Sequence, residues 1–203
     1  KNSRNYGHLK GVETVKKIVE GSIKLNIKYL TFYVFSTENW KRPKSEINYL
    51  FNLIYLYFEK ELNQVIKNGI KVKVIGNMTK FSKKSKMILK ETEKKTKLNK
   101  KITVCLAINY GSRQEIVKSI KKNKKKVIID EKSISNNLFT HNIPDPDILI
   151  RSGGRQRLSN FMLWQLAYTE LFFIKKLWPD FNISDLKKIV TKYKSIKRNF
   201  GGI

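Results

Sequence analysis

The residue types best suited to chemistry stand together between positions 151 and 170. Arg151, Arg155 and Arg157 accompany a glycine pair at 153–154, directly after the apolar run at 148–150. Guanidinium groups bind phosphate oxygens in pairs, and glycine lets the backbone approach an anion. The pattern indicates an anion cradle at the C-terminal end of a strand, where ligands bind in parallel sheets. The ligand that it predicts carries phosphate, and the competing interpretation is a surface turn that happens to be basic.

Glu170 lies beyond this cradle in an otherwise apolar stretch, residues 161–174. A buried carboxylate needs a partner, because an unpaired charge is costly to remove from water. A magnesium ion, an arginine or a serine could each supply that partner. A divalent cation held by Glu170 would suit a diphosphate bound beside it.

A second polar connector, residues 36–43, follows another apolar run. Asn39 and Arg42 could reach a phosphate or a reacting carbon if this connector closes over a substrate. In the alternative interpretation the connector is a helix entry in which Trp40 packs and Glu46 pairs with a lysine.

Arg4 and His8 flank Gly7, ahead of a helical pattern. Backbone N–H groups at a helix N-terminus favour negative charge, so both side chains could bind an anion there. An incidental surface histidine is the alternative.

The composition is strongly basic, with a formal net charge of +27 over 203 residues. Such a charge fits nucleic acid, anionic lipid or phosphorylated substrates, but it also arises from lysines on solvated faces. Only seven of the 43 basic residues are arginines, and three of the seven lie at 151–157. We therefore assign the lysines to solvated surface and the arginines to function.

Several classes of protein are disfavoured. The sequence has no zinc-ligand spacing, no phosphate-binding loop ending in Gly-Lys-Ser/Thr, no nucleophile elbow and no apolar run long enough to cross a bilayer. The single cysteine, Cys105, sits in an apolar run, which predicts packing and a reducing, cytosolic compartment.

The hydrophobic periodicity predicts strands alternating with helices. Strands are expected at 27–35, 70–75, 102–108, 147–150 and 171–174, and helices at 11–25, from a Ser45 cap to about 69, from a Ser82 cap to about 99, from about 112, near 134–139 and at 184–197. This order predicts an α/β fold with an open, mostly parallel central sheet flanked by helices on both faces. The polar connectors at 36–42, 109–113 and 151–159 should then converge at one edge.

These connectors resemble the cis-prenyltransferases, and specifically the bacterial undecaprenyl diphosphate synthases, over residues 4–203. The matching stretches are Gly7-His8-x-x-Gly11, Tyr33-x-Phe35-Ser36-x-Glu38-Asn39-Trp40-x-Arg42-Pro43, Asn109-Tyr110-Gly111-x-Arg113, Asp147-x-x-Ile150-Arg151-x-Gly153-Gly154, Arg157-Leu158-Ser159-Asn160-Phe161-x-Leu163-Trp164-Gln165, Glu170-Leu171, Leu177-Trp178-Pro179 and Phe200-Gly201-Gly202.

The resemblance implies a magnesium-dependent homodimeric enzyme. It would extend an allylic prenyl diphosphate, such as farnesyl diphosphate, with isopentenyl diphosphate to make a long-chain polyprenyl diphosphate such as undecaprenyl diphosphate, a cell-wall lipid carrier. A cytoplasmic location, with peripheral contact to the anionic inner face of the membrane and no nucleic acid partner, would accompany that activity.

The resemblance also assigns roles to residues. The allylic diphosphate would be held by Arg4 and His8, and the isopentenyl diphosphate by Arg151, Arg157, Leu158 and Ser159. The substrate site would be lined by Ser36, Thr37, Glu38 and Trp40, with Glu46 in a mobile loop. Asn39 and Arg42 would act at the condensing carbons, Asn39 as proton acceptor, and Glu170 would ligate magnesium.

Three departures from the family pattern affect these expectations. The family segment Asp-Gly-Asn-Gly-Arg-Trp, with a catalytic metal-binding aspartate, would precede Arg4 and is absent from the sequence. We therefore expect residues 1–203 to be a single cis-prenyltransferase domain lacking its N-terminal strand and this segment. Arg155 replaces a glutamate, and Asn199 replaces an arginine that would reach across a dimer.

Two other functions remain as alternatives at this point. One is a non-catalytic subunit of a prenyltransferase, which the retained arginines and Glu170 disfavour. The other is a basic nucleic-acid-binding protein, which the net charge suggests but no recognition motif supports.

Overall fold

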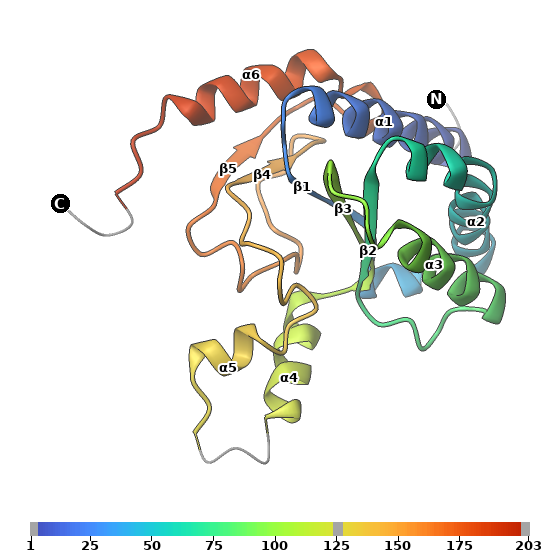
Figure 1. Cartoon of the computed structure of the whole chain (residues 1–203), viewed down its shortest axis with the longest axis horizontal. Coiled ribbons are helices and arrows are strands. Elements are labelled where there is room, and N and C mark those ends of the chain that lie inside the picture. The colour runs from blue at the N-terminus through green and yellow to red at the C-terminus, as the bar shows by residue number, and fades with distance from the viewer. Residues whose placement is uncertain (1–3, 124–127, 200–203) are drawn as a thin grey trace. The chain divides into compact units, whose positions relative to one another are not determined.

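The computed structural model describes residues 4–123 and 128–199, with side chains from Tyr6 onward. Contacts divide the chain into two compact units. The central unit comprises residues 26–143, and the terminal unit comprises residues 1–25 and 144–203. Figure 1 shows the elements of both units.

The sheet of the central unit has three strands in the order β1-β3-β2, and both neighbouring pairs are parallel. The strands are β1 (Tyr29–Ser36), β2 (Ile70–Ile75) and β3 (Ile102–Tyr110). Residues 104–110 of β3 are all buried. A middle strand covered on both faces needs such an unbroken apolar run, and this run is the signal from which the strand at 102–108 was predicted.

Helices cover this sheet and lead into the candidate site. The helices α2 (Lys44–Lys67) and α3 (Lys83–Thr96) pack against each other and on β2 (Figure 1). The short helix η1 (Thr37–Lys41) follows β1, and α4 (Ser112–Lys122) and α5 (Glu131–Ser135) follow β3. Each strand of the central unit is therefore followed by a helix, as in other parallel α/β folds.

The described strands leave the outer edge of β2 unpaired, and side chains of α3 and of the segment just after it cover this edge. The amide of Val72 donates to the Thr96 hydroxyl at 3.0 Å, and the amide of Val74 donates to the Glu93 carboxylate at 2.8 Å. The side chain of Asn99 donates to the carbonyl of Ile70 at 2.8 Å. These bonds satisfy backbone groups that would otherwise be open to pairing with a foreign strand.

The terminal unit contains α1 (Arg4–Lys24), the parallel pair β4 (Ile148–Arg151) and β5 (Glu170–Phe173), the short helix η2 (Trp178–Asp180) and α6 (Ile183–Lys194). The indole of Trp178 donates to the carbonyl of Gly11 at 3.0 Å, and the hydroxyl of Thr14 donates to the carbonyl of Pro179 at 3.0 Å. A Cβ at Gly11 would lie 3.3 Å from the Trp178 ring. The close approach of α1 to η2 therefore depends on a glycine.

The predicted fold class is confirmed, because strands alternate with helices and every described strand pair is parallel. The described strands form a three-stranded and a two-stranded sheet. The expectation of one domain over residues 1–203 stays a prediction.

Several predicted boundaries were wrong. The first helix begins at Arg4 rather than near residue 11, and Ser45 does not cap α2, which begins at Lys44 after Pro43. Proline pre-sets the backbone angle at such an entry, which a search for hydroxyl caps overlooks. The short helix α5 lies several residues earlier than expected, and α6 ends at Lys194.

The cap predicted at Ser82 is confirmed, since its hydroxyl accepts from the Ser85 amide at 3.1 Å. None of the helices formed by the described residues is both long and apolar enough to span a bilayer.

The covered edge of β2 generates a pH prediction. Burial raises the pKa of Glu93 above its ordinary value of 4.5, although its bond to Val74 and two nearby lysines oppose the shift. A raised folded-state pKa means that this carboxyl stabilises the fold most below 4.5 and loses that contribution as the pH rises through the folded pKa. We expect Glu93→Gln, which keeps an acceptor for Val74, to be more stable than the parent at neutral pH, with the difference vanishing in acid.

Urea unfolding at a series of pH values measures this difference. The matched control is Glu91→Gln on the same helix, whose carboxylate pairs with Lys95 at 2.7 Å near the surface. A neutral-pH gain for Glu91→Gln equal to that of Glu93→Gln would contradict the prediction.

Candidate active site

The predicted site residues fall into two groups, one in each unit. Ser36, Thr37, Glu38, Asn39, Trp40, Arg42 and Glu46 lie in the central unit, at the end of β1, in η1 and in the first turn of α2. Arg4, His8, Arg151, Arg157, Leu158, Ser159 and Glu170 lie in the terminal unit.

The turn after β1 is fastened by Asn39. Its side-chain oxygen accepts from the Ser36 amide at 3.0 Å, and its carbonyl accepts from the Arg42 amide at 3.0 Å. The hydroxyl of Thr37 donates to Glu38 at 3.0 Å. The carboxamide of Asn39 is therefore held in one orientation by the backbone that precedes it.

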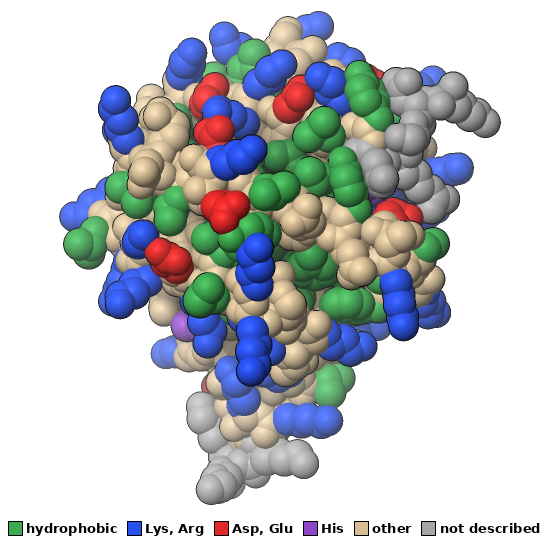
Figure 2. Space-filling view, turned by 90° about the vertical axis from the view of Figure 1, so that its right-hand side faces the viewer, with side chains coloured by type: hydrophobic (Ala, Val, Ile, Leu, Met, Phe, Trp, Pro, Cys, Tyr) green, Lys and Arg blue, Asp and Glu red, His purple; other side chains and the backbone are tan. Residues whose placement is uncertain are grey.

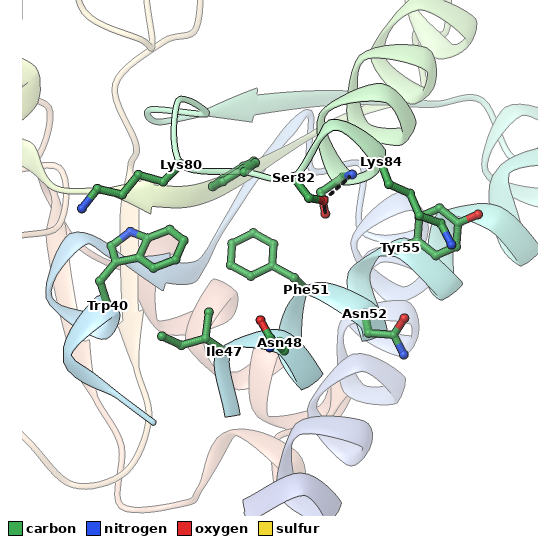
Figure 3. A pocket seen from close by; sticks show the side chains of 11 residues that line it. Trp40, Ile47, Asn48, Phe51, Asn52, Tyr55, Lys80, Ser82 and Lys84 are labelled. Atoms are coloured by element: carbon green, nitrogen blue, oxygen red, sulfur yellow. Dashed lines mark hydrogen bonds between the residues drawn. The ribbon is translucent and has the colours of Figure 1, made fainter. Parts of the chain in front are cut away.

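Trp40 packs in an aromatic cluster, as the helix-entry interpretation proposed (Figure 3). Its ring stacks on Phe51 at a centroid distance of 5.8 Å and meets the Phe35 ring edge-on at 5.1 Å. The ammonium of Lys80 lies 5.5 Å from the Trp40 ring centroid. Aromatic packing of this kind fixes the ring and so the position of the whole η1 turn.

The polar end of Trp40 ties η1 to the ends of the other two strands. Its indole N–H donates to the side-chain oxygen of Asn109 at 2.7 Å, and the Asn109 amide group donates to the carbonyl of Asn77. Asn109 has a φ of 49°, and Gly76 has a φ of 127°. A Cβ added to Gly76 would lie only 2.1 Å from the carbonyl oxygen of Ile108. Both positions need residues that tolerate positive φ. The two hydrogen bonds of Asn109 bring the predicted connectors 36–42 and 109–113 together. The connector 151–159 lies in the terminal unit, and its convergence with them stays a prediction.

Arg42 and Glu46 form an ion pair, with 3.1 Å between guanidinium and carboxylate. Glu46 is only 9% exposed, whereas the Arg42 side chain is 37% exposed. Arg42, which the helix-entry interpretation did not name, is thus an ion-pair partner of Glu46. The pair is one helical turn apart and holds the arginine at the entry of α2.

Tyr33 lies beside this turn and remains protonated over the neutral range. Burial, assisted by the negative charge of Glu38, raises the pKa of Tyr33 to about 12. Its hydroxyl donates to the carbonyl of Tyr110 at 3.2 Å.

In the terminal unit, Arg151 closes the loop that follows β4. Its guanidinium donates to the carbonyl of Arg157 and, at 2.8 Å, to the hydroxyl of Ser159. The amides of Gly153 and Gly154 donate to carbonyls of the segment after β5 at 2.9 and 2.8 Å, and both glycines have positive φ. The cradle is therefore built by side chains and backbone together.

Positive charge accumulates in this loop. Partial burial lowers the pKa of the Arg151 guanidinium, and repulsion from Arg157 lowers it further. Among the described side chains no carboxylate pairs with Arg151 or Arg157. Arg155, Arg157 and Ser159 are exposed and Leu158 is half-buried. Two guanidinium groups held close without a counter-charge favour the binding of an anion.

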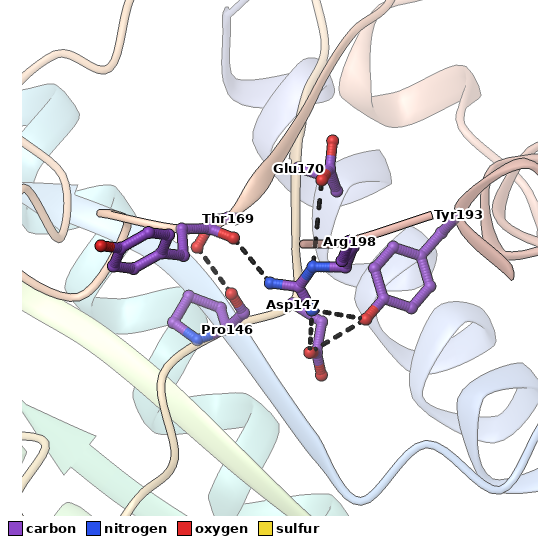
Figure 4. A network of polar contacts seen from close by, with 7 residues as sticks. Pro146, Asp147, Thr169, Glu170, Tyr193 and Arg198 are labelled. Atoms are coloured by element: carbon purple, nitrogen blue, oxygen red, sulfur yellow. Dashed lines mark hydrogen bonds and ion pairs between the residues drawn. The ribbon is translucent and has the colours of Figure 1, made fainter. Parts of the chain in front are cut away.

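Glu170, the first residue of β5, has an arginine as its nearest described charge (Figure 4). The Nε of Arg198 lies 3.9 Å from a Glu170 oxygen. Arg198 is held more firmly by Asp147 at 2.9 Å, by the Tyr193 hydroxyl at 2.8 Å and by the Tyr168 carbonyl at 2.6 Å. Sequence reasoning missed this network, because Arg198 and Asp147 are 51 positions apart.

Arg4 and His8 lie within α1 rather than ahead of a helix, which corrects the predicted helix start. His8 is half-buried, and the side chain of Arg4 is outside the described residues. Asn199, where the family has an arginine, is exposed.

Glu170 is the candidate metal ligand. The described residues contain no group of three or more His, Cys, Asp or Glu side chains placed to hold a metal ion. A single carboxylate suits magnesium that takes its other ligands from diphosphate oxygens and water.

The comparisons with known proteins identify the class. The sequence model of the undecaprenyl diphosphate synthase family matches residues 1–201. An isoprenyl transferase of Clostridium perfringens is 44% identical, over 98% of this chain and 82% of that protein. An isoprenyl transferase of Prochlorococcus marinus is 42% identical, over 98% of this chain and 76% of that protein.

Solved structures agree. A probable undecaprenyl diphosphate synthase from Campylobacter jejuni superposes with a TM-score of 0.87 at 36% identity, covering 95% of this chain and 92% of that one. Lavandulyl diphosphate synthase from Lavandula x intermedia, in complex with dimethylallyl diphosphate, superposes with a TM-score of 0.92 at 32% identity. The match covers 98% of this chain and 89% of that one. The chain is thus a prenyltransferase by class. It belongs to the undecaprenyl diphosphate synthase family.

The link between Trp40 and Asn109 generates a prediction. We expect Asn109→Ala to lower the free energy of unfolding by about 1–3 kcal/mol, because it leaves the Trp40 indole and the Asn77 carbonyl without their partner. It should also shift tryptophan emission to the red as Trp40 loosens. Urea unfolding followed by fluorescence measures both effects.

The control is Asn77→Ala in the same turn, whose side chain accepts from the Thr79 amide at an exposed position. A loss of stability for Asn77→Ala as large as that for Asn109→Ala would contradict the proposed role of the link.

Proposed function

We propose that this prenyltransferase condenses isopentenyl diphosphate with an allylic diphosphate, farnesyl diphosphate in the first cycle, and that repeated cycles make a long-chain polyprenyl diphosphate such as undecaprenyl diphosphate. One observation carries the proposal. Arg151 and Arg157 are held close together at the end of β4, beside Ser159, with no carboxylate partner among the described residues. The natural occupant of such a cradle is a diphosphate.

The relatives support this choice of substrate. A structural neighbour has been solved with dimethylallyl diphosphate, which is an allylic diphosphate. Another neighbour is described as an undecaprenyl diphosphate synthase. We propose the same class of substrate, an allylic diphosphate, and the same product, undecaprenyl diphosphate, for this chain.

The reaction requires that the negative charge of the departing diphosphate be neutralised. In each cycle the bond between the allylic carbon and its diphosphate breaks, the terminal carbon of isopentenyl diphosphate bonds to that allylic carbon, and a proton leaves the isopentenyl unit. Guanidinium groups stabilise the diphosphate that departs, which lowers the barrier to an allylic cation. Water must be kept away from that cation.

The turn after β1 is the proposed place of bond formation. Asn39 is oriented by the Ser36 amide, and its carboxamide oxygen has a second lone pair with which to accept the proton. Arg42, held by Glu46, adds positive charge at the entry of α2. Ser36, Thr37, Glu38 and Trp40 would line the substrate, and His8 with Arg4 would bind the allylic diphosphate.

Magnesium is proposed as the cofactor. Glu170 would hold it, and the ion would neutralise diphosphate charge. The 34% exposed carboxylate of Glu170 leaves room for a hydrated ion. We also propose a homodimer, and a cytoplasmic location with peripheral contact to the inner face of the membrane.

Arg151→Ala tests the substrate assignment. Loss of its charged hydrogen bonds should lower kcat/KM for isopentenyl diphosphate on the order of ten- to one-hundred-fold. Incorporation of labelled isopentenyl diphosphate into butanol-extractable product, with farnesyl diphosphate and magnesium supplied, measures the loss. The length of the dephosphorylated product shows whether undecaprenyl diphosphate forms.

The control Lys188→Ala removes one positive charge from an exposed position on α6 and should leave turnover unchanged. These assays use the full-length protein, with any segment upstream of Lys1 included. A full-length protein that binds inorganic pyrophosphate but never incorporates isopentenyl units would point instead to a non-catalytic subunit. A full-length protein that binds neither diphosphate would contradict the proposal.

Removal of magnesium tests the cofactor. Chelation should abolish turnover, and added magnesium should restore it. We expect Glu170→Gln to need at least ten-fold more magnesium for half-maximal rate, roughly the effect of losing one ligand. Unaltered magnesium dependence in Glu170→Gln would remove this residue from the metal site.

A further inference from the structure

The N-terminal parts of α2 and α3 border a cavity that shares Trp40 with the proposed substrate site (Figure 3). It has a volume of about 470 Å³. Its floor is apolar, formed by Trp40, Ile47, Phe51 and Phe81, and the Phe51 and Phe81 rings lie 4.9 Å apart. All of these residues belong to the central unit. The cavity is suited to a hydrocarbon chain.

Two lysines rim this cavity. Lys80 lies at the Trp40 end, and Lys84 lies over the Tyr55 ring at 3.8 Å from its centroid. The Tyr55 hydroxyl in turn bonds to Glu59. An apolar floor below a cationic rim matches an amphiphile with an anionic headgroup.

The exposed side of α3 continues this charge away from the cavity. Lys83, Met87, Lys90, Lys94 and Lys97 follow one another at spacings of four, three, four and three, which places them on one stripe of the helix surface. All five are exposed, and Met87 has 65% of its surface open to solvent. None of the four lysines forms an ion pair among the described residues. We call these five residues the α3 stripe.

The acidic residues of α3 are turned away from this stripe or already paired. Glu91 pairs with Lys95 at 2.7 Å, and Glu93 accepts from the Val74 amide of β2. Leu98, which is 84% exposed, adds an apolar side chain just beyond the helix. Figure 2, which faces the side where Figure 1 places α2 and α3, shows hydrophobic side chains exposed among lysines.

We infer that the α3 stripe and the neighbouring cavity form a docking surface for an anionic lipid bilayer. The four lysines bind anionic headgroups, Met87 enters the interfacial region, and the cavity receives a hydrocarbon chain from the bilayer. Juxtaposed lysines attract anionic membranes additively, and an exposed apolar side chain among them strengthens the contact. The inference deepens the membrane contact of the proposed function by naming the surface that makes it.

A bilayer fits this surface better than nucleic acid does. Phosphate-backbone binding would use the lysines alone, whereas the surface combines lysines with Met87, Leu98 and an apolar cavity.

Sedimentation with vesicles tests the inference. The full chain is mixed with vesicles of phosphatidylglycerol and phosphatidylcholine, and separately with pure phosphatidylcholine vesicles, without prenyl substrates. Binding should need phosphatidylglycerol and should weaken as salt is raised. The triple variant Lys83→Gln, Lys90→Gln, Lys94→Gln should lower the partition coefficient on the order of one-hundred-fold.

The matched control is the triple variant Lys187→Gln, Lys188→Gln, Lys194→Gln on α6, which removes the same charge from exposed positions. It should lose only a small part of the binding. Thermal unfolding verifies that both triple variants fold. Equal losses in the two variants would overturn the inference, because net charge alone would then explain binding.

Fluorescence quenching tests whether the cavity takes up a lipid chain. Lipids with brominated acyl chains should quench tryptophan fluorescence in the vesicle-bound protein, and Trp40→Phe should remove most of that quenching. Absence of quenching, or binding of duplex DNA but not of vesicles through the α3 stripe, would overturn the inference.

Failure of the proposed function is distinguishable from failure of this inference. Turnover is assayed in detergent, where the α3 triple variant should match the parent. A parent that binds vesicles but transfers no prenyl group would contradict the proposed function only.

Discussion

The hydrogen bonds that hold Arg151 in the loop of Arg157 and Ser159 are the constraint on which the basic part of the candidate site depends. The Arg151 guanidinium donates to the Arg157 carbonyl and to Ser159, which keeps the two arginines near each other. The loop is anchored in turn by the backbone of Gly153 and Gly154. The fold thus maintains an excess of positive charge that an anionic ligand would neutralise. A protein without such a ligand would gain nothing from this arrangement.

In the central unit the site residues are positioned by the ends of the strands and by aromatic packing. Its strands end in residues that tolerate positive φ, and Asn109 joins the ends of β2 and β3 to the indole of Trp40. Aromatic packing then holds η1, and with it Asn39 and Arg42. Polar groups are in this way presented by a rigid framework, which is how loops at the ends of strands carry function.

Family membership and the proposed activity rest on different grounds. Membership follows from a family match over residues 1–201 and from relatives above 40% identity over almost the whole chain. The substrates, the magnesium ion and the product remain proposals supported by the basic cradle and by Glu170. The membrane surface rests on the α3 stripe and stands independently of the reaction. Each can therefore be tested without assuming the others.

Much of the fold was predictable because its signals are local. The apolar run of β3 and the Ser82 cap of α3 could be located from residue types alone, and parallel pairing followed from the alternation of strands with helices. The entry of α2 was misplaced, since Pro43 rather than a hydroxyl residue precedes it. The start of α1 was missed because its first turns lack an apolar stripe.

Residue identity by itself determined the class of chemistry: arginines concentrated beside glycines and hydroxyls can serve only a limited set of ligands. Tertiary structure alone decided the partners. Trp40 reaches Asn109 across 69 positions, and Glu170 has Arg198 as its nearest described charge. Such pairings depend on how distant segments approach one another. The free energy of bringing those segments together cannot be inferred from any local stretch of sequence.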